Sequence, residues 1–202
     1  MKVREIDAFV ETEQLVLRRF TQADVERLFS LHNDPDVMRF LNGGKLASRR
    51  EIEREYRERF AKDGYWAAIE KATDDFIGWF SFQPRKDRGP DEFELGYRLS
   101  RSAWGHGYAT EGSRALIHKG FTELGVRRVF AETMAVNLAS RRVMEKSGLE
   151  YVRTFHEDWS DPIAGAEHGE VEYALTRAAW ERREAEGHQW TPARNGTAYS
   201  PE

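Results

Sequence analysis

Cysteine is absent from the 202 residues, and its absence excludes several kinds of protein. A chain without cysteine forms no disulfide framework, holds no thiolate zinc site and offers no cysteine nucleophile. Long apolar runs are missing too, since no stretch approaches the roughly 20 residues that cross a membrane. The first residues lack the apolar segment of a signal peptide. We therefore expect a cytoplasmic protein that stays out of the membrane.

An excess of charge of one sign is also missing, because 31 Lys and Arg residues face 35 Asp and Glu residues, for a net charge of −4. The neighbouring arginines form isolated pairs and no continuous basic stripe, so we expect no nucleic-acid partner. Hydrophobic residues make up 40% of the chain, which is enough for a sizeable core. We expect one domain over residues 1–180 and a polar, flexible tail over residues 181–202.

The apolar pattern predicts a mixed order of strands and helices. An early strand and an amphipathic helix come first, over residues 15–20 and 25–32, and a thin amphipathic helix follows over 49–62. The next strands are joined by connections too short for helical crossovers, so they form an antiparallel meander. The strands of the meander are 65–70, 76–82 and 93–99. The remaining chain is predicted to form helix 109–124, strand 129–133, helix 138–147, and strands 151–155 and 171–176.

The most informative segment joins the strand that ends at Leu99 to the following helix. It reads Trp104-Gly105-His106-Gly107-Tyr108-Ala109-Thr110-Glu111. Its glycines allow positive φ and leave room for a ligand near the helix N-terminus, where free N–H groups attract an anion such as pyrophosphate. The alternative without a binding function is that this segment is an ordinary helix N-terminus preceded by turn glycines. A damaged dinucleotide-binding fingerprint, with Glu132 as the ribose-binding acid, is a further alternative.

This segment resembles the acetyl-CoA pyrophosphate loop of the GNAT superfamily of N-acetyltransferases. Its Trp104 and its Ala-Thr-Glu sequence resemble the branch that acetylates the N-termini of ribosomal proteins. The same branch is similar near the N-terminus, where Thr12, Leu15, Leu17 and Arg18 precede Asp24. The segment from Asn137 to Leu149, with Ser140 and Arg142, resembles the second motif of the superfamily. The resemblance covers about residues 12–180, in four separated segments that occur in the expected order.

The resemblance implies an α/β fold of mixed type. Its sheet is mostly antiparallel, has about six or seven strands that splay apart in the middle, and is flanked by about four helices. It also implies acetyl-CoA as the acetyl donor and no metal. The residues that it assigns to the cofactor are Leu99, Ser100, Trp104, Gly105, His106, Gly107, Tyr108, Ala109, Thr110, Asn137 and Ser140.

The implied reaction moves an acetyl group from acetyl-CoA to a primary amine. Without cysteine there is no acetyl-cysteine intermediate, which favours direct attack by the amine. The resemblance gives the Ser140 hydroxyl to the departing thiolate and Glu157 to the attacking amine as its base. Glu94 and His156 are alternative bases. Asn137 is a favoured N-cap whose amide can also touch the cofactor.

The acceptor side is less defined by the sequence. We expect it to use His32, Asp34 and Phe40 near the first helices, together with an acidic, aromatic-edged loop. The loop residues are Glu157, Asp158, Trp159, Asp161, Glu167 and Glu170. Such a surface attracts a cationic amine, either a peptide N-terminus or a small molecule.

Two other functions compete with the acetyltransferase. One is a non-catalytic module that binds acyl-CoA, and the other is an NAD-dependent oxidoreductase. A homodimer is also possible, through the aromatic strand at residues 79–82 or through the final strands.

Overall fold

The fold is built on one twisted sheet, seen in a computed structural model that describes residues 8–41, 44–157 and 162–187. The described residues form eight strands in the order β1-β2-β3-β4-β5-β6-β8-β7. Their bounds are β1 (Ala8–Glu11), β2 (Leu15–Arg18), β3 (Tyr65–Glu70), β4 (Phe76–Pro84), β5 (Glu92–Leu99), β6 (Arg128–Met134), β7 (Glu150–Phe155) and β8 (Glu170–Thr176). Every pair of neighbouring strands is antiparallel except β5 and β6.

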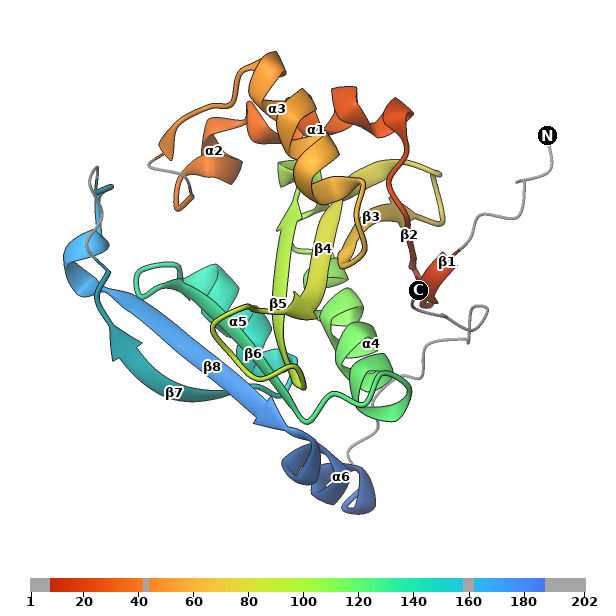
Figure 1. The fold of residues 1–202 in the computed structure, drawn as a ribbon, viewed down its shortest axis with the longest axis vertical. Helices are drawn as coiled ribbons and strands as arrows, with labels where there is room; N and C mark the ends of the chain where they lie inside the picture. Colours follow the sequence, from red (N-terminus) through yellow and green to blue (C-terminus); the bar gives the residue numbers. More distant parts are fainter. Residues whose placement is uncertain (1–7, 42–43, 158–161, 188–202) are drawn as a thin grey trace.

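The parallel pair is the place where the sheet opens. β5 and β6 pair only from Glu92 to Glu94 and from Arg128 to Phe130, although both strands continue beyond those residues. Figure 1 shows the two strands diverging from that point. The expected splay is therefore present, and it separates the carboxyl-terminal halves of β5 and β6. A mostly antiparallel sheet also argues against the parallel sheet that a dinucleotide-binding fingerprint would require.

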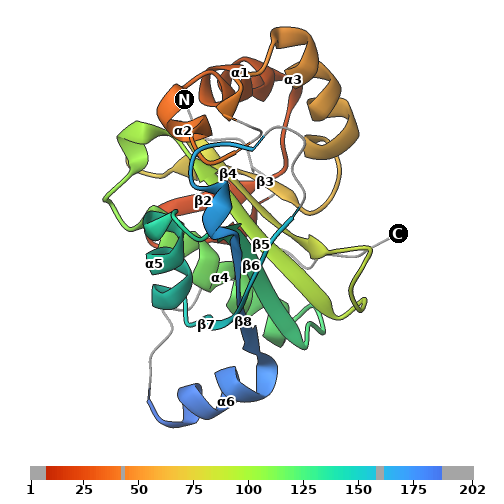
Figure 2. The same ribbon diagram turned by 90° about the vertical axis from the view of Figure 1, so that its left-hand side faces the viewer.

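Helices cover both faces of the sheet. Their bounds are α1 (Val25–His32), α2 (Pro35–Met38), α3 (Arg49–Glu55), α4 (Tyr108–Thr122), α5 (Leu138–Lys146) and α6 (Arg177–Ala185). Short helical turns lie at Gln22–Asp24, Tyr56–Phe60, Arg101–Ala103 and Ala166–His168. Figures 1 and 2 show α1, α2 and α3 gathered at one end of the molecule and α6 at the other.

The alternation of β5 defines the two faces. Leu95 and Leu99 belong to the core under α4 and α5, which we call the back face, and Tyr97 packs against it. Gly112 on α4 lies so close to the sheet that an added Cβ would come within 2.4 Å of Phe80. Glu94, Gly96 and Arg98 therefore point to the opposite side, the front face.

The front face has its own core beneath the first helices. Ile52 of α3, Phe60 and Trp79 are buried there with the apolar side of α1. Trp79 and Phe80 are 7% and 0% exposed, so the aromatic segment of β4 is internal and supplies no dimer interface, contrary to the sequence expectation. At the edge of the sheet, β7 exposes Tyr151 and Val152.

The predicted fold class is confirmed, and most of the predicted strands and helices occur with shifts of one or two residues at their ends. The helix predicted over 49–62 ends as α3 at Glu55 and continues as a helical turn to Phe60. The sequence analysis missed β1 and α2, which have four residues each, and α6, which has nine. Pro35 ends α1 as expected, but it also begins α2, because the first helical position tolerates proline and Asp34 caps the turn. The boundary expected at residue 180 falls within α6, while residues 188–202 lie outside the described part.

No helix in residues 8–41, 44–157 and 162–187 is long and apolar enough to cross a membrane. The same residues contain no group of three or more His, Asp or Glu side chains placed to hold a metal ion.

Candidate functional site

The N-terminus of α4 is open and has the geometry that an anion requires. Gly105 and Gly107 adopt φ values of 79° and 87°, and a Cβ added at either would meet no atom within 4 Å. The backbone is therefore bare on the side where the first N–H groups of α4 have no partner within the helix. Glu111 in the first turn is directed elsewhere, since its carboxylate accepts hydrogen bonds from the backbone and side chain of Gln14.

Three side chains of the loop contact neighbouring residues and fix its shape. The ring of His106 stacks on Tyr108, and the Tyr108 hydroxyl donates to Glu70 at the end of β3. Trp104 donates from its indole Nε1 to the carbonyl oxygen of Leu99 at 3.0 Å, which ties the loop to the end of β5. The main chain of the loop is thus left to a ligand.

The end of β5 directs one backbone N–H group toward the splay. The N–H of Ser100 donates to the carbonyl oxygen of Ile77 on β4 at 2.8 Å. Because successive N–H groups of a strand point to opposite sides, the N–H of Leu99 points toward β6. Leu99 and Ser100 are both assigned to the cofactor by the resemblance. Leu99 has an N–H directed into the splay, while the N–H of Ser100 is engaged within the sheet.

A bulge on β4 supports this arrangement. Gly78 lies opposite Leu99, has a φ of 140°, and stands where the register between β3 and β4 shifts. A Cβ at this position would lie 2.1 Å from the carbonyl oxygen of Arg98. Only glycine allows β4 to approach the end of β5 so closely.

The start of α5, which follows β6, places the Ser140 hydroxyl beside the Tyr97 hydroxyl of β5. The Asn137 Oδ1 accepts the Ser140 N–H at 3.3 Å, and its Nδ2 donates to Thr133 on β6 at 3.1 Å. Asn137 is thus an N-cap, as the sequence predicted. The Ser140 hydroxyl lies 2.9 Å from the Tyr97 hydroxyl, which also donates to the Ser140 carbonyl oxygen at 3.2 Å.

Tyr97 was not singled out by the sequence analysis. Burial raises its pKa to about 12, against which the hydrogen bond with Ser140 is a smaller effect. The hydroxyl is therefore neutral near pH 7 and able to donate. The alternation of β5 predicts that Tyr97 lies on the same face as Phe93, Leu95 and Leu99. It does not predict that Ser140 on α5 is its hydrogen-bond partner.

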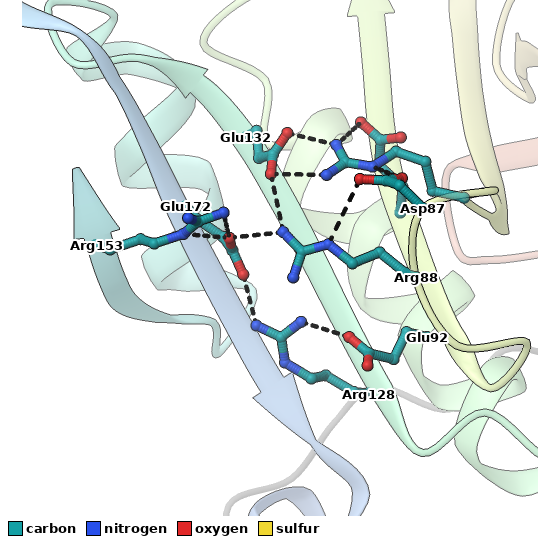
Figure 3. Close-up of polar contacts among 9 residues, drawn as sticks. Asp87, Arg88, Glu92, Arg128, Glu132, Arg153 and Glu172 are labelled. Carbon is teal, nitrogen blue, oxygen red and sulfur yellow. Dashed lines mark hydrogen bonds and ion pairs between the residues drawn. The ribbon is translucent and has the colours of Figure 1, made fainter. Parts of the chain in front are cut away.

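The front face carries a network of carboxylates and arginines that links β5, β6 and β8 (Figure 3). Glu172 of β8 is 1% exposed and meets Arg88, Arg128 and Arg153 at 2.6–2.9 Å. Burial alone would raise the pKa of Glu172, but the hydrogen bonds from these arginines outweigh it and lower the pKa to about 2.

The remaining members of this network lie on the neighbouring strands. Glu132 of β6 meets Arg85 at 2.5 Å and Arg88 at 3.5 Å. Glu92 of β5 meets Arg128 at 2.7 Å. The arginines thus pair with these front carboxylates through charge-assisted hydrogen bonds.

The candidate bases differ in their surroundings. Glu94 lies on the front face, 3.8 Å from Arg85, and burial raises its pKa. Glu157 follows β7, is exposed, and lies close enough to Glu170 to raise the pKa of that residue. The His156 ring lies 3.4 Å from the Glu167 carbonyl oxygen and packs beside Gly169. His156 and Glu157 therefore make different contacts, as neighbours at the end of a strand should.

Glu170 stands out among the residues of the acidic loop. Burial raises its pKa to about 7, and the charges of Glu157 and Glu132 add to the effect. The other expected acceptor residues of that loop, Asp158, Trp159 and Asp161, lie outside the described residues.

His32 does not line an acceptor site. It is 3% exposed, packs against Phe60, and receives the Trp79 Nε1 hydrogen bond on its Nε2 at 3.4 Å. Its expected contribution to acceptor binding is therefore wrong, because α1 turns this residue into the front core. Asp34 is partly exposed and caps α2.

A cavity of about 570 Å³ lies on the α1 and α2 side of the loop. Its wall includes Asp34, Ile77, Ser100, His106 and Tyr108. Because Ser100 faces Ile77 of β4, this cavity and the splay lie on opposite sides of the end of β5.

Comparison with known proteins gives one family. Residues 14–150 match the family described as "Acetyltransferase (GNAT) domain". The chain is 39% identical over 139 residues to the FsC-acetyl coenzyme A-N(2)-transacetylase of Aspergillus fumigatus, which covers 64% of this chain and 58% of that protein. It is 35% identical over 158 residues to the uncharacterized protein YkkB of Bacillus subtilis, which covers 76% of this chain and 91% of that protein. The chain thus spans less than two thirds of the Aspergillus relative.

Solved structures share the same fold. A GNAT-family acetyltransferase from Bacillus anthracis superposes with a TM-score of 0.72 at 23% identity, covering 84% of this chain and 98% of that one. The spermidine N-acetyltransferase of Vibrio cholerae, solved with CoA and spermine, gives a TM-score of 0.71 at 16% identity and covers 84% of this chain and 99% of that one.

Proposed function

Because the chain belongs to the GNAT family of acetyltransferases, which use acetyl-CoA, we propose that it moves the acetyl group of acetyl-CoA directly to a primary amine. Both substrates are bound at once, and the amine attacks the thioester carbonyl carbon. The site divides these tasks between the two faces of the sheet. The donor enters from the back face, where α4 and α5 begin, and the acceptor approaches from the front.

The observation that carries the proposal is the convergence of three groups on the splay. The bare N-terminus of α4 suits the pyrophosphate, the Leu99 N–H suits the thioester carbonyl, and the Ser140 hydroxyl suits the departing sulfur. The loop residues from Trp104 to Thr110 hold the pyrophosphate mainly through their backbone, and Asn137 fixes the Ser140 turn. The base is a carboxylate of the front face, for which Glu157 and Glu94 are the candidates from the sequence.

For the acceptor we propose a small-molecule amine. The Aspergillus relative is named for transfer to an N(2) amine, and its identity of 39% supports this class more than a protein N-terminus. The ribosomal-protein branch suggested by the loop sequence remains the second class to test. The acidic residues near Glu157 and Glu170 suit a cationic amine of either class.

An acceptor screen tests the proposal. Purified protein is incubated with acetyl-CoA and a panel of amino acids, polyamines, aminoglycosides and peptides with free N-termini, while release of free CoA is measured. Turnover with a small amine supports the proposal, and turnover with peptides alone moves the acceptor to the second class.

Binding measurements separate the competing functions. Calorimetry with CoA and NAD shows CoA binding if the assignment is right. CoA binding without turnover of any amine would favour a non-catalytic acyl-CoA-binding module, and NAD binding without CoA binding would overturn the assignment.

A further inference from the structure

The register of the sheet places one residue from each of β5, β6 and β8 at the level of the Leu99 N–H, where the thioester carbonyl is proposed to bind. The pairing of Glu94 with Phe130 places Arg98 of β5 level with Met134 of β6, four residues further along each strand. Met134 pairs in turn with Glu170 of β8. Leu99, which directs its N–H into the splay, directly follows Arg98. The Glu170 carboxylate therefore stands on the front face at the level where the amine must attack.

Glu170 also differs from the other front-face carboxylates in its partners. Glu92, Glu94, Glu132 and Glu172 each have an arginine within 4 Å. Within the described part of the chain, Glu170 forms no salt bridge. Four of the front-face carboxylates thus have a cationic partner, whereas Glu170, at the level of Met134 on β6, keeps its oxygens available for a proton.

We infer that the Glu170 carboxylate accepts the proton of the attacking amine, an assignment that rests on the proposed function. The amine nitrogen forms a bond to the acetyl carbon, and its proton passes to a Glu170 oxygen. The carbon–sulfur bond then breaks, and the CoA thiolate leaves with its charge stabilised by a hydrogen bond from the Ser140 hydroxyl. The thiolate then takes a proton from water, and Glu170 returns its proton to water. Proton acceptance on the front face and thiolate departure on the back face fit a thioester held between β5 and β6.

The charges around Glu170 suit this role. Its pKa is raised to about 7 by burial, by Glu157 and by Glu132, which is close to the best value for a base at neutral pH. The elements packed around β8 carry charged groups of both signs. These are Arg98 on β5, Glu132 on β6, Arg153 on β7, His156 and Glu157 after β7, Glu167 and His168 before β8, Glu172 on β8, and Arg85 and Arg88 between β4 and β5. In this arrangement Glu170 is the base, and the charge of Glu157 raises its pKa.

The experiment compares Glu170→Gln, Glu157→Gln and the wild type over pH 5.5–9 with an amine found in the screen. At saturating substrates, kcat of the wild type should fall on the acidic side with a midpoint near pH 7. Glu170→Gln should lower kcat about 100-fold or more and abolish that limb. Glu157→Gln should keep the limb and move its midpoint to lower pH, because a negative charge that raised the pKa of Glu170 is gone.

Glu150→Gln is the matched control. Glu150 begins β7 at the end away from Glu157 and is exposed, and the new amide oxygen can still accept the hydrogen bond from Arg183. The variant should match the wild type within about twofold. Calorimetry should give the same CoA affinity for all variants, which shows that the donor site is intact.

Each outcome decides one question. A wild type that binds CoA but acetylates no amine contradicts the proposed function. An active wild type whose Glu170→Gln variant keeps kcat and the acidic limb contradicts the role of Glu170. Loss of the limb in Glu157→Gln, with only a shift in Glu170→Gln, would exchange the two roles and overturn the inference.

Discussion

Single side chains decide how the two borders of the splay are joined. Tyr97 on β5 and Ser140 on α5 are 43 residues apart in the chain, yet their hydroxyls lie 2.9 Å apart. The Tyr97 hydroxyl is buried and neutral, so it can donate to the Ser140 oxygen when the Ser140 proton turns toward the thiolate. Tyr97 is thus a positioning residue for the group proposed to serve the leaving sulfur.

Replacing Tyr97 by phenylalanine tests that role. One hydrogen bond of about 1 kcal/mol is lost, so we expect Tyr97→Phe to lower kcat about fivefold to tenfold while the CoA affinity stays the same. Steady-state kinetics and calorimetry measure the two quantities. In the Ser140→Ala background the same change should have little further effect, because the partner of Tyr97 is already absent.

The control is Tyr151→Phe on β7. Its hydroxyl also bonds a neighbouring hydroxyl, that of Thr154 at 2.8 Å, but on the exposed edge of the sheet. We expect no change in kcat. If Tyr97→Phe is as active as Tyr151→Phe, the Tyr97 hydroxyl does not position Ser140.

At the scale of elements, the two ends of α4 make a natural comparison. Each end has a glycine with positive φ, 87° at Gly107 before the helix and 71° at Gly125 after it, and each has open space where a Cβ would be. The conformational strain of alanine is therefore similar at both ends, about 1–2 kcal/mol. Only the Gly107 end presents N–H groups to an anion.

We expect Gly107→Ala to weaken CoA binding about tenfold or more, because the new methyl group occupies the space in which the pyrophosphate approaches the backbone. Gly125→Ala should bind CoA as the wild type does. Calorimetric Kd values decide the matter, and melting temperatures should fall by similar amounts in both variants. Equal CoA affinity of the two variants would show that the α4 N-terminus does not hold the cofactor.

At the scale of the whole molecule, a buried histidine links stability to pH. His32 packs between α1 and the front of the sheet, where burial, and then the charges of Arg98 and Arg59, lower its pKa to about 3. The unfolded chain binds a proton to this histidine below about pH 6.5, and the folded chain does so only near pH 3. The stability supported by neutral His32 is therefore complete above pH 6.5 and is lost as the pH falls.

His32→Gln tests this contribution, since its amide oxygen can accept the Trp79 hydrogen bond without titrating. Between pH 7 and pH 5 the free energy of unfolding of the wild type should lose about 2 kcal/mol relative to the variant. Urea unfolding at both pH values measures the difference. Glu170 acts in the opposite sense in both proteins, so the comparison isolates His32. Parallel pH profiles for the two proteins would contradict the assignment.

The sequence by itself determined those features of this protein that depend on interactions between residues close together in the chain. The glycines at 105 and 107, the Asn137 cap and the alternation of β5 each depend on residues a few positions apart. Hydrogen bonds and backbone conformations over such distances are set by residue type, which is why the anion loop, the α5 start and the mixed fold class were predicted.

Only the tertiary structure decided which side chains meet. The Tyr97–Ser140 pair, the burial of His32 and the place of Glu170 opposite Met134 arise from contacts between segments distant in the chain. A shift of one residue in the pairing of a strand would turn each of its side chains to the opposite face, and no short pattern fixes that register. The proposed anion site could therefore be predicted from the sequence, whereas the proposed proton acceptor required the register of β5, β6 and β8.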